Sequence, residues 1–597
     1  VQVRGMGEFS TESIMETASK PESVSFGEIP LRFGAWEYGI FIAMLGISAL
    51  IGIYFGFMTK KKQDNTEEYL LGGKTMSIFP VSCSLIASHV SGSTILGIPT
   101  QIYAYGTQYW MFVICAILTY LGITYVYLPV FHELQMTSCF LYLEKRFDRR
   151  VRVVASFVFA LNIMLFVPAV IYTPALAFSQ VSGLNLHLIT PIICAICIFY
   201  TTVGGLKAVV YTDALQFILM VGATLIVMFL GIRMTGGFSG VWETAERGGR
   251  IIFFNMDPNP RLGMSFWTVT LGLSITWISL IGVTQSSVQR FLSLPDMKKA
   301  QKSAVFFAAG LIFIKTCCIF VGLIMYAKYE SCDPYSMGIV KKLDQILPLF
   351  IMDVGASMPG LPGLFIAGIF SAALSSMSTS LNTLAGTIYE DFLRHRLPKA
   401  SEKQASNTMK LIVVILGVIQ LACVFVVERM GTVFYLTLAL NGLTAGALLG
   451  LFSMGMMMRK ANTKGVIAGT LLSLAIVATI VIGAQFAQRP PPLTLRVDGC
   501  AAINGTTPIT EKIILPENDM HWIFLISPMY YPLIGIIIFL SVGYTVSHMT
   551  GGYNLEDERL LCHFMRSREF RERQKRDEAQ YVKISMALKE LEANGKK

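Results

Sequence analysis

A run of small and polar residues, 88–94, interrupts an otherwise apolar stretch of the chain. Within it only Val90 is neither polar nor glycine. Transporters bind cations where a helix unwinds near the middle of the bilayer, because the unwound backbone exposes its carbonyl oxygens. The run therefore predicts a broken helix that binds an ion or a substrate. Close helix packing through small residues is the alternative; it accounts for Gly92 but poorly for His89.

A second polar cluster, residues 371–382, lies in another apolar stretch and consists largely of hydroxyl side chains. Four of its residues recur every three or four positions and predict one polar helical face: Ser371, Ser375, Ser378 and Asn382. A second hydroxyl row lies beside it: Ser376, Thr379 and Ser380. Neutral oxygens suit a monovalent cation, although hydroxyls also bond back to their own helix.

Two further segments place polar side chains at the ends of apolar stretches. Asp213, in the segment 204–216, either caps a helix N-terminus or serves the exit path of an ion, and its position alone leaves both open. In the segment 284–290, Arg290 is expected to reach the cytoplasmic edge of the membrane. Gln285 lies deeper and is a candidate for a pocket. Trp277 either walls that pocket or packs in the core.

The composition favours lipid as the solvent of this chain. Of its 597 residues, 53% are hydrophobic and 14% are charged, whereas soluble proteins carry roughly 25% charged residues. The net charge of +10 comes from short basic clusters between apolar runs, so nucleic acid is not an expected partner. The sequence contains no HExxH, GxSxG or Walker A motif and no metal-type spacing of its 11 Cys, so an enzyme is not expected.

Apolar runs of about 20 residues, the length that spans a bilayer, predict an all-α polytopic membrane protein with about 13 transmembrane helices. Their centres lie near residues 47, 92, 120, 165, 196, 222, 275, 315, 372, 420, 445, 474 and 537.

The clusters of Lys and Arg predict an extracellular N-terminus and a cytoplasmic C-terminus. Asn504 is the only glycosylation acceptor found, and it falls on the extracellular side of this topology. Cys332 and Cys500 fall in loops on the same side, where a disulfide between them is possible and remains open. The expected organisation is an extracellular segment 1–35, a transmembrane domain 36–548 with an extracellular loop 487–520, and a cytoplasmic tail 549–597.

Together these motifs resemble the sodium/solute symporter family over about residues 36–485. Residues 204–216 look like the family signature, and the Ala-Leu-Ser-Ser block at 373–376 looks like its ion-site helix. Three stretches look closest to the branch that holds the sodium-dependent multivitamin transporter and the sodium-coupled monocarboxylate transporters: 105–110, 361–367 and 446–452.

The resemblance implies a LeuT-like five-plus-five inverted-repeat core, with repeats at about 78–235 and 265–458, and a plasma-membrane location. It also implies a sodium site between the first and eighth core helices. The implied ligands are the backbone carbonyls of Ala87, Val90 and Ala372 and the hydroxyls of Ser375 and Ser376, with Asp213 on the exit path. Sodium is the coupling ion, and no other cofactor is implied.

The predicted substrate site differs from that of the sugar transporters in this family. Their sugar-binding positions look like Ser93 and Thr94 here, and their tyrosine gate falls on Leu280, which leaves shorter and fewer hydrogen-bond donors. His89, Gln285 and Trp277 complete the candidate site.

The resemblance therefore implies sodium-coupled import of small organic anions, either vitamins such as biotin and pantothenate or short monocarboxylates. An inorganic anion such as iodide, or a nutrient sensor or channel built on the same fold, is the alternative. The sequence leaves open the substrate, the sodium stoichiometry, the apical or basolateral location and the oligomeric state.

Overall fold

The protein is described from a computed structural model of the chain. The described residues are 33–58, 76–136, 138–356, 358–397, 401–428, 433–487, 492–500, 521–551, 555, 557–574 and 576. Asn504, most of the segment 1–35 and most of the tail 549–597 lie outside them, so the predictions on those residues are not tested.

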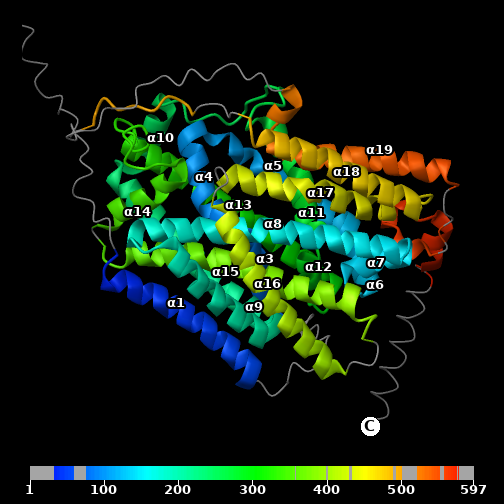
Figure 1. Cartoon of the computed structure of the whole chain (residues 1–597). Coiled ribbons are helices and arrows are strands. Elements are labelled where there is room, and N and C mark those ends of the chain that lie inside the picture. Colours follow the sequence, from blue (N-terminus) through cyan, green and yellow to red (C-terminus); the bar gives the residue numbers. More distant parts are fainter. Residues whose placement is uncertain are drawn as a thin grey trace, which may run out of the picture.

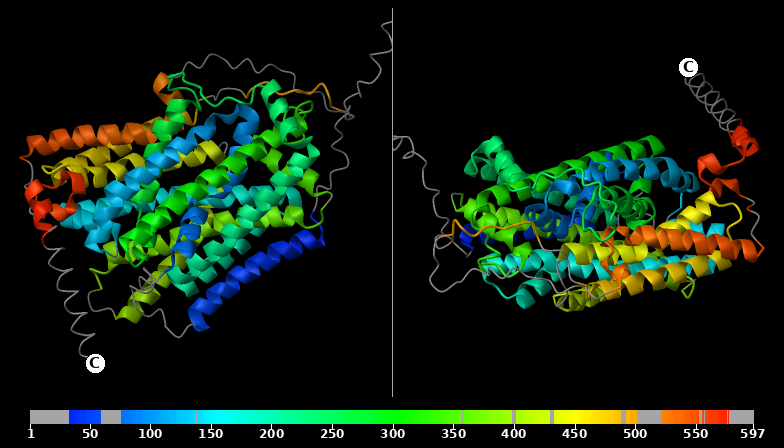
Figure 2. Two further views of the ribbon diagram at one scale, coloured as in Figure 1. Left: turned by 180° about the vertical axis from the view of Figure 1, so that it is seen from behind. Right: turned by 90° about the horizontal axis from the view of Figure 1, so that it is seen from above.

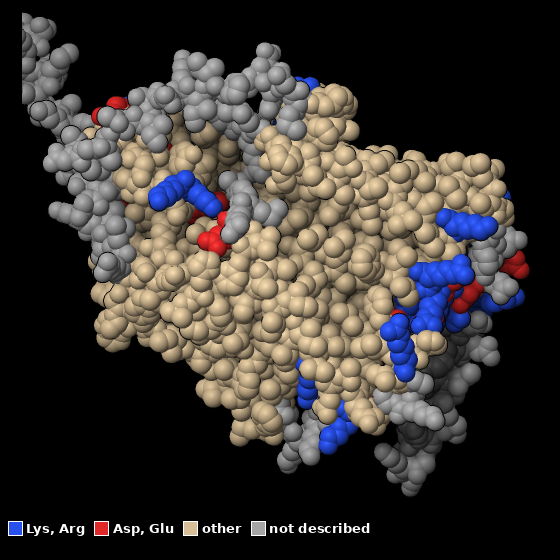
Figure 3. All heavy atoms as spheres, viewed as in Figure 1, with Lys and Arg blue, Asp and Glu red and all other residues tan. Residues whose placement is uncertain are grey.

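The described part of the chain folds into membrane-length helices, as the sequence predicted. Eleven helices are long and apolar enough to cross a bilayer, and two bent helix pairs bring the number of spans to thirteen. On the face shown in Figure 3, uncharged residues form the broad middle, and the charged side chains lie toward its edges. The all-α polytopic fold follows from this pattern, since helices satisfy every backbone polar group without water.

The first half of the core contains five spans. The first is a bent pair, and α9 contributes the last two spans, Leu186–Gly204 and Ala208–Met234. Its helices are α3 (Ile78–His89), α4 (Gly92–Tyr105), α5 (Phe112–Gly122), α6 (Leu128–Leu134), α7 (Cys139–Arg146), α8 (Arg149–Ser182) and α9 (Leu186–Met234).

The second half repeats this arrangement, because it also opens on a bent pair and continues through four further spans. Its helices are α11 (Leu273–Gly282), α12 (Gln285–Leu292), α13 (Met297–Tyr329), α14 (Ile346–Gly355), α15 (Leu361–Ile388), α16 (Glu402–Val427) and α17 (Val433–Met457). The short α10 (Gly237–Arg247) lies between the halves.

Three spans lie outside the two halves. They are α1 (Ala35–Ile53), α18 (Thr463–Ala484) and α19 (Tyr531–Met549). In both Figure 1 and the rear view of Figure 2, α1 and α19 occupy opposite edges of the molecule. α1 packs on α9 and α15, whereas α19 packs on α17 and α18. The core helices between them are therefore shielded from lipid on two sides.

α13 approaches α4 closely because Gly322 lies at their contact. A Cβ at this position would lie 2.6 Å from the carbonyl oxygen of Pro99 on α4, far inside van der Waals contact. Side chains two helical turns from Gly322 on the same face of α13 are therefore directed toward the broken span α3–α4.

A disulfide joins Cys332, after α13, to Cys500, after α18, with the two Cα atoms 4.9 Å apart. Backbone hydrogen bonds flank it, from Asp333 to Arg496 at 2.8 Å and from Gly499 to Ser331 at 2.9 Å. The pairing that the sequence left open is thus formed. Disulfides persist in oxidising compartments, and the extracellular location of both segments stays a prediction.

We expect Cys332→Ser to lower the apparent free energy of unfolding by about 2–5 kcal/mol, because the cross-link restricts the unfolded chain. Thermal melting of the detergent-purified protein measures this. Cys423→Ser is the control, since Cys423 is a half-buried free cysteine. Equal melting temperatures for Cys332→Ser and the wild type would show that the bridge adds no stability.

Candidate functional site

The first core span is broken at Val90 and Ser91. α3 ends at His89, α4 begins at Gly92, and the two helix axes differ by 58°. Val90 has extended backbone angles, with φ −97° and ψ 90°. The last carbonyls of α3 therefore lose their intrahelical donors in the middle of the protein, which is the local structure that the run 88–94 predicted.

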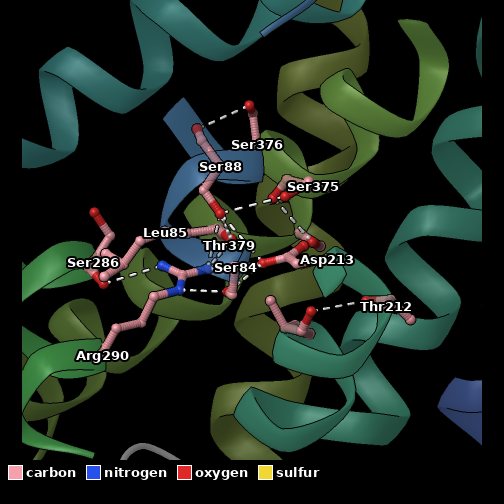
Figure 4. Close-up of polar contacts among 12 residues, drawn as sticks. Ser84, Leu85, Ser88, Thr212, Asp213, Ser286, Arg290, Ser375, Ser376 and Thr379 are labelled. Carbon is pink, nitrogen blue, oxygen red and sulfur yellow. Dashed lines mark hydrogen bonds and ion pairs between the residues drawn. The ribbon is translucent and has the colours of Figure 1, made fainter. Parts of the chain in front are cut away.

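α15 supplies hydroxyl groups to this break. Ser376 Oγ lies 3.1 Å from the carbonyl oxygen of Ser88 and 3.0 Å from that of Ala372, so that its one hydrogen is shared between these two acceptors. Ser88 Oγ lies 3.3 Å from Ser375 Oγ and 3.0 Å from Thr379 Oγ1. Figure 4 shows these hydroxyls converging between the two helices. The structure thus brings the helices with the predicted sodium ligands together, while sodium binding stays a prediction.

A buried ion pair lies directly beside these hydroxyls. Arg290 Nη2 is 3.1 Å from Asp213 Oδ2, and their side chains are 1% and 0% exposed. Asp213 Oδ2 also accepts hydrogen bonds from Ser84 at 2.7 Å and Ser88 at 3.2 Å. Arg290 donates to Thr379 Oγ1 at 2.5 Å, so the pair connects α9, α12, α3 and α15 (Figure 4).

The expectation that Arg290 reaches the edge of the membrane is wrong. The second bent span turns by 53° between α11 and α12, so α12 packs against α3 and α15. The guanidinium is directed into the protein and not toward lipid headgroups (Figure 4).

The possibility that Asp213 caps a helix is also wrong, since α9 is continuous from Leu186 to Met234 and contains Asp213 in its interior. The sequence suggested a cap because Asp213 lies at the start of a predicted span.

A cavity of about 120 Å³ adjoins the break and is lined by side chains from eight core helices and by Tyr109. Four of the five predicted substrate residues line it: His89, Ser93, Thr94 and Trp277. Ser88 and Ser376 belong both to this wall and to the hydroxyl cluster. An ion at the break and a molecule in the cavity would therefore be neighbours.

The imidazole of His89 is held in place on this wall. Its Nδ1 lies 2.8 Å from the carbonyl oxygen of Leu85, and its Nε2 lies 3.3 Å from Ser287 Oγ. Ser93 Oγ lies 2.7 Å from Ser91 Oγ at the start of α4. Both side chains thus have fixed orientations at the broken end of the span.

Gln285, the fifth predicted substrate residue, does not line the cavity. Its side-chain oxygen accepts a hydrogen bond of 2.6 Å from the backbone N–H of Cys139, at the first residue of α7. The bend before α12 directs this amide toward α7, which sequence spacing along an assumed straight helix could not show.

Several polar residues of the cavity wall were missed by sequence reasoning, among them Lys315 and Asn162. Lys315 lies within the apolar span α13, and Asn162 lies within α8, where its Nδ2 donates to Thr444 at 2.7 Å. A single basic residue amid an apolar run was the available signal for Lys315, because such residues are rare inside membranes and mark function.

The fold and the site define an α-helical membrane transporter of the LeuT type. Residues 69–473 match the model of the Sodium:solute symporter family, and the chain belongs to this family. As the relatives below are also transporters, the chain is not an enzyme, and sodium is its coupling ion.

Several characterised relatives cover most of the chain. Sodium-coupled monocarboxylate transporter 1 of Mus musculus is 37% identical, over 89% of this chain and 90% of the relative. Sodium-coupled monocarboxylate transporter 2 of Mus musculus is 35% identical, over 87% and 84%. The Sodium/iodide cotransporter of Homo sapiens is 33% identical, over 89% and 86%.

A solved structure of a Na+-coupled sialic acid symporter, in a substrate-bound outward-open state, shares the fold. Its TM-score is 0.70 at 24% sequence identity, and the alignment covers 88% of this chain and 100% of that chain.

We expect Asp213→Asn and Arg290→Gln each to lower the apparent free energy of unfolding by about 3–5 kcal/mol, because each leaves the other charge buried and unpaired. The double variant should lose less than the sum. Thermal melting at fixed sodium concentration measures all three. Arg247→Gln, which breaks an exposed pair with Glu330, should cost at most about 1 kcal/mol. Additive losses would contradict the pairing.

Proposed function

We propose that this protein is a plasma-membrane symporter that uses sodium to import short monocarboxylate anions by alternating access. One observation carries the proposal. Ser88 and Ser376 belong to the hydroxyl cluster at the helix break and also line the cavity, so the two sites share a wall. Neighbouring sites allow an ion and a substrate to stabilise each other directly. The N-terminus is extracellular and the C-terminus cytoplasmic in this proposal.

Sodium would bind at the break through the carbonyl oxygens of Ala87, Val90 and Ala372 and the hydroxyls of Ser375 and Ser376. Support comes from the hydroxyls of α15 already being directed at the end of α3, and from neutral oxygens being suited to sodium.

Asp213 would attract the ion on its exit path. Its Oδ1 atom is buried and has no hydrogen-bond partner within the described residues. A buried carboxylate oxygen without a donor is costly, and a passing cation would relieve that cost.

The relatives favour a short monocarboxylate over a vitamin. The cavity of about 120 Å³ beside the helix break would hold the substrate. His89, Ser93, Thr94 and Trp277 would contact the substrate, and relatives named as monocarboxylate transporters support this assignment.

Coupling follows from the shared wall. Sodium binds first from outside, and it raises the affinity for substrate by the same factor by which substrate raises the affinity for sodium. Rearrangement of the bundle then opens both sites to the cytoplasm. Each net positive charge that enters gains about 2.3 kcal/mol per 100 mV of membrane potential.

A second candidate substrate is an inorganic anion such as iodide. The small cavity also admits a halide, and one relative is named as a Sodium/iodide cotransporter. A polar wall of hydroxyls and His89 favours a carboxylate, which accepts several directed hydrogen bonds.

In cells that express the chain, we expect labelled L-lactate to accumulate in sodium buffer and not when choline replaces sodium. Biotin and pantothenate should accumulate much less, because two relatives that cover most of the chain are named as monocarboxylate transporters. Iodide uptake in the same assay separates the two candidate substrates. Lactate uptake equal in both buffers, or no uptake by protein shown to be at the cell surface, would contradict the proposal.

We expect the double variant Ser375→Ala/Ser376→Ala to raise the sodium concentration for half-maximal uptake at least tenfold, because two ion ligands are removed. Thr470→Ala is the matched control. Thr470 is a buried hydroxyl of α18 that bonds to the carbonyl oxygen of Val466 on its own helix, away from the site. An unchanged sodium dependence in the double variant, with surface expression matched to the control, would rule out this ion site.

A further inference from the structure

Lys315 places a buried cation in the wall of the cavity. It lies in the middle of α13, its side chain is 3% exposed, and it lines the same cavity as His89, Ser93 and Thr94. It is two helical turns from Gly322, where α13 touches α4. The backbone thus brings its ammonium group to the broken span.

Aromatic rings surround this ammonium group on one side. Its Nζ lies 3.6 Å from the ring centre of Phe112, 4.4 Å from that of Trp277 and 5.0 Å from that of Tyr109. It also donates a hydrogen bond of 2.7 Å to the hydroxyl of Tyr109. Ring faces attract a cation, so these rings favour the protonated form of the Lys315 side chain.

No acidic side chain pairs with Lys315 within the described part of the chain. This distinguishes it from Arg290, which is equally buried but is paired with Asp213. An unpaired charge inside a membrane protein is expensive, and such residues face a cavity and serve ligands. Since Tyr109 takes one of the three N–H groups of the ammonium, others remain for a partner in the cavity.

We propose that Lys315 binds the carboxylate of the substrate and is the residue that makes the site selective for anions. The proposal rests on the proposed function in one respect, that the transported solute is an anion. The aromatic rings hold the ammonium from one side, and the carboxylate completes its coordination from the cavity. The hydroxyl-bearing wall of α4 then contacts the rest of a short substrate.

The same geometry gives Lys315 a part in coupling. With no substrate present, the ammonium and a sodium ion at the adjacent break repel each other, because like charges in a low-dielectric interior interact strongly. A carboxylate that binds beside both cations removes this repulsion. Substrate binding would therefore favour sodium binding, and the reverse, through the anion itself.

Equilibrium binding to purified protein in nanodiscs tests the proposal, with L-lactate and its neutral amide, lactamide, as the two probes. In the wild type with saturating sodium, lactate should bind at least tenfold more tightly than lactamide. In Lys315→Met, which keeps the length of the side chain and removes the charge, this ratio should fall toward one. Sodium binding without substrate should be as tight as in the wild type or tighter.

Lys302→Met is the matched control, because Lys302 is an exposed lysine on the same helix. It should leave the lactate-to-lactamide ratio unchanged. A purely structural role for Lys315 would weaken lactate and lactamide binding together and lower the melting temperature, and that result would overturn the proposal. So would a ratio in Lys315→Met that matches the wild type.

These outcomes are distinguishable from a failure of the proposed function. If the wild type binds iodide and not lactate, the monocarboxylate assignment is wrong, and Lys315→Met should then weaken iodide binding at least tenfold. Unchanged iodide binding in that variant would overturn the role of Lys315. If the wild type binds neither anion, both proposals are wrong.

Discussion

The structure depends on the rule that every backbone polar group inside a bilayer needs a partner. Two core spans are interrupted, at residues 90–91 and 283–284, and all four of these residues are buried. At the first break, Ser376 of α15 donates to the carbonyl oxygen of Ser88. In the proposed site, carbonyl oxygens that the unwound backbone exposes are satisfied by the ion together with the hydroxyls of Ser375 and Ser376.

Buried charged side chains, like buried backbone groups, need a partner inside the protein. Arg290 and Asp213 neutralise each other among hydroxyls from α3 and α15, so the protein holds a full ion pair beside the break without an isolated charge. Lys315 is held by aromatic rings and one hydroxyl, without an anion of its own within the described residues. Arg290 therefore has a partner anion within the protein. Lys315 is left to pair with an anion that enters the cavity.

Local patterns in the sequence were sufficient to predict the spans, the break at residues 88–94 and the hydroxyl face of α15, because each depends on composition and helical period alone. They were insufficient where a bend redirects a side chain. The turn between α11 and α12 sends Arg290 inward and Gln285 toward α7, and neither follows from spacing along a straight helix. Lys315 was missed because a single lysine in an apolar run carries no pattern, although its rarity was itself a signal.

The central claim is that a sodium site and an anion site share a wall and are thermodynamically linked. Equilibrium binding of ²²Na+ to the purified protein, with and without saturating L-lactate, and of labelled lactate, with and without sodium, tests this link most directly. The account predicts that lactate tightens sodium binding by the same factor as sodium tightens lactate binding. Sodium binding that is indifferent to lactate, in protein that binds lactate, would contradict it.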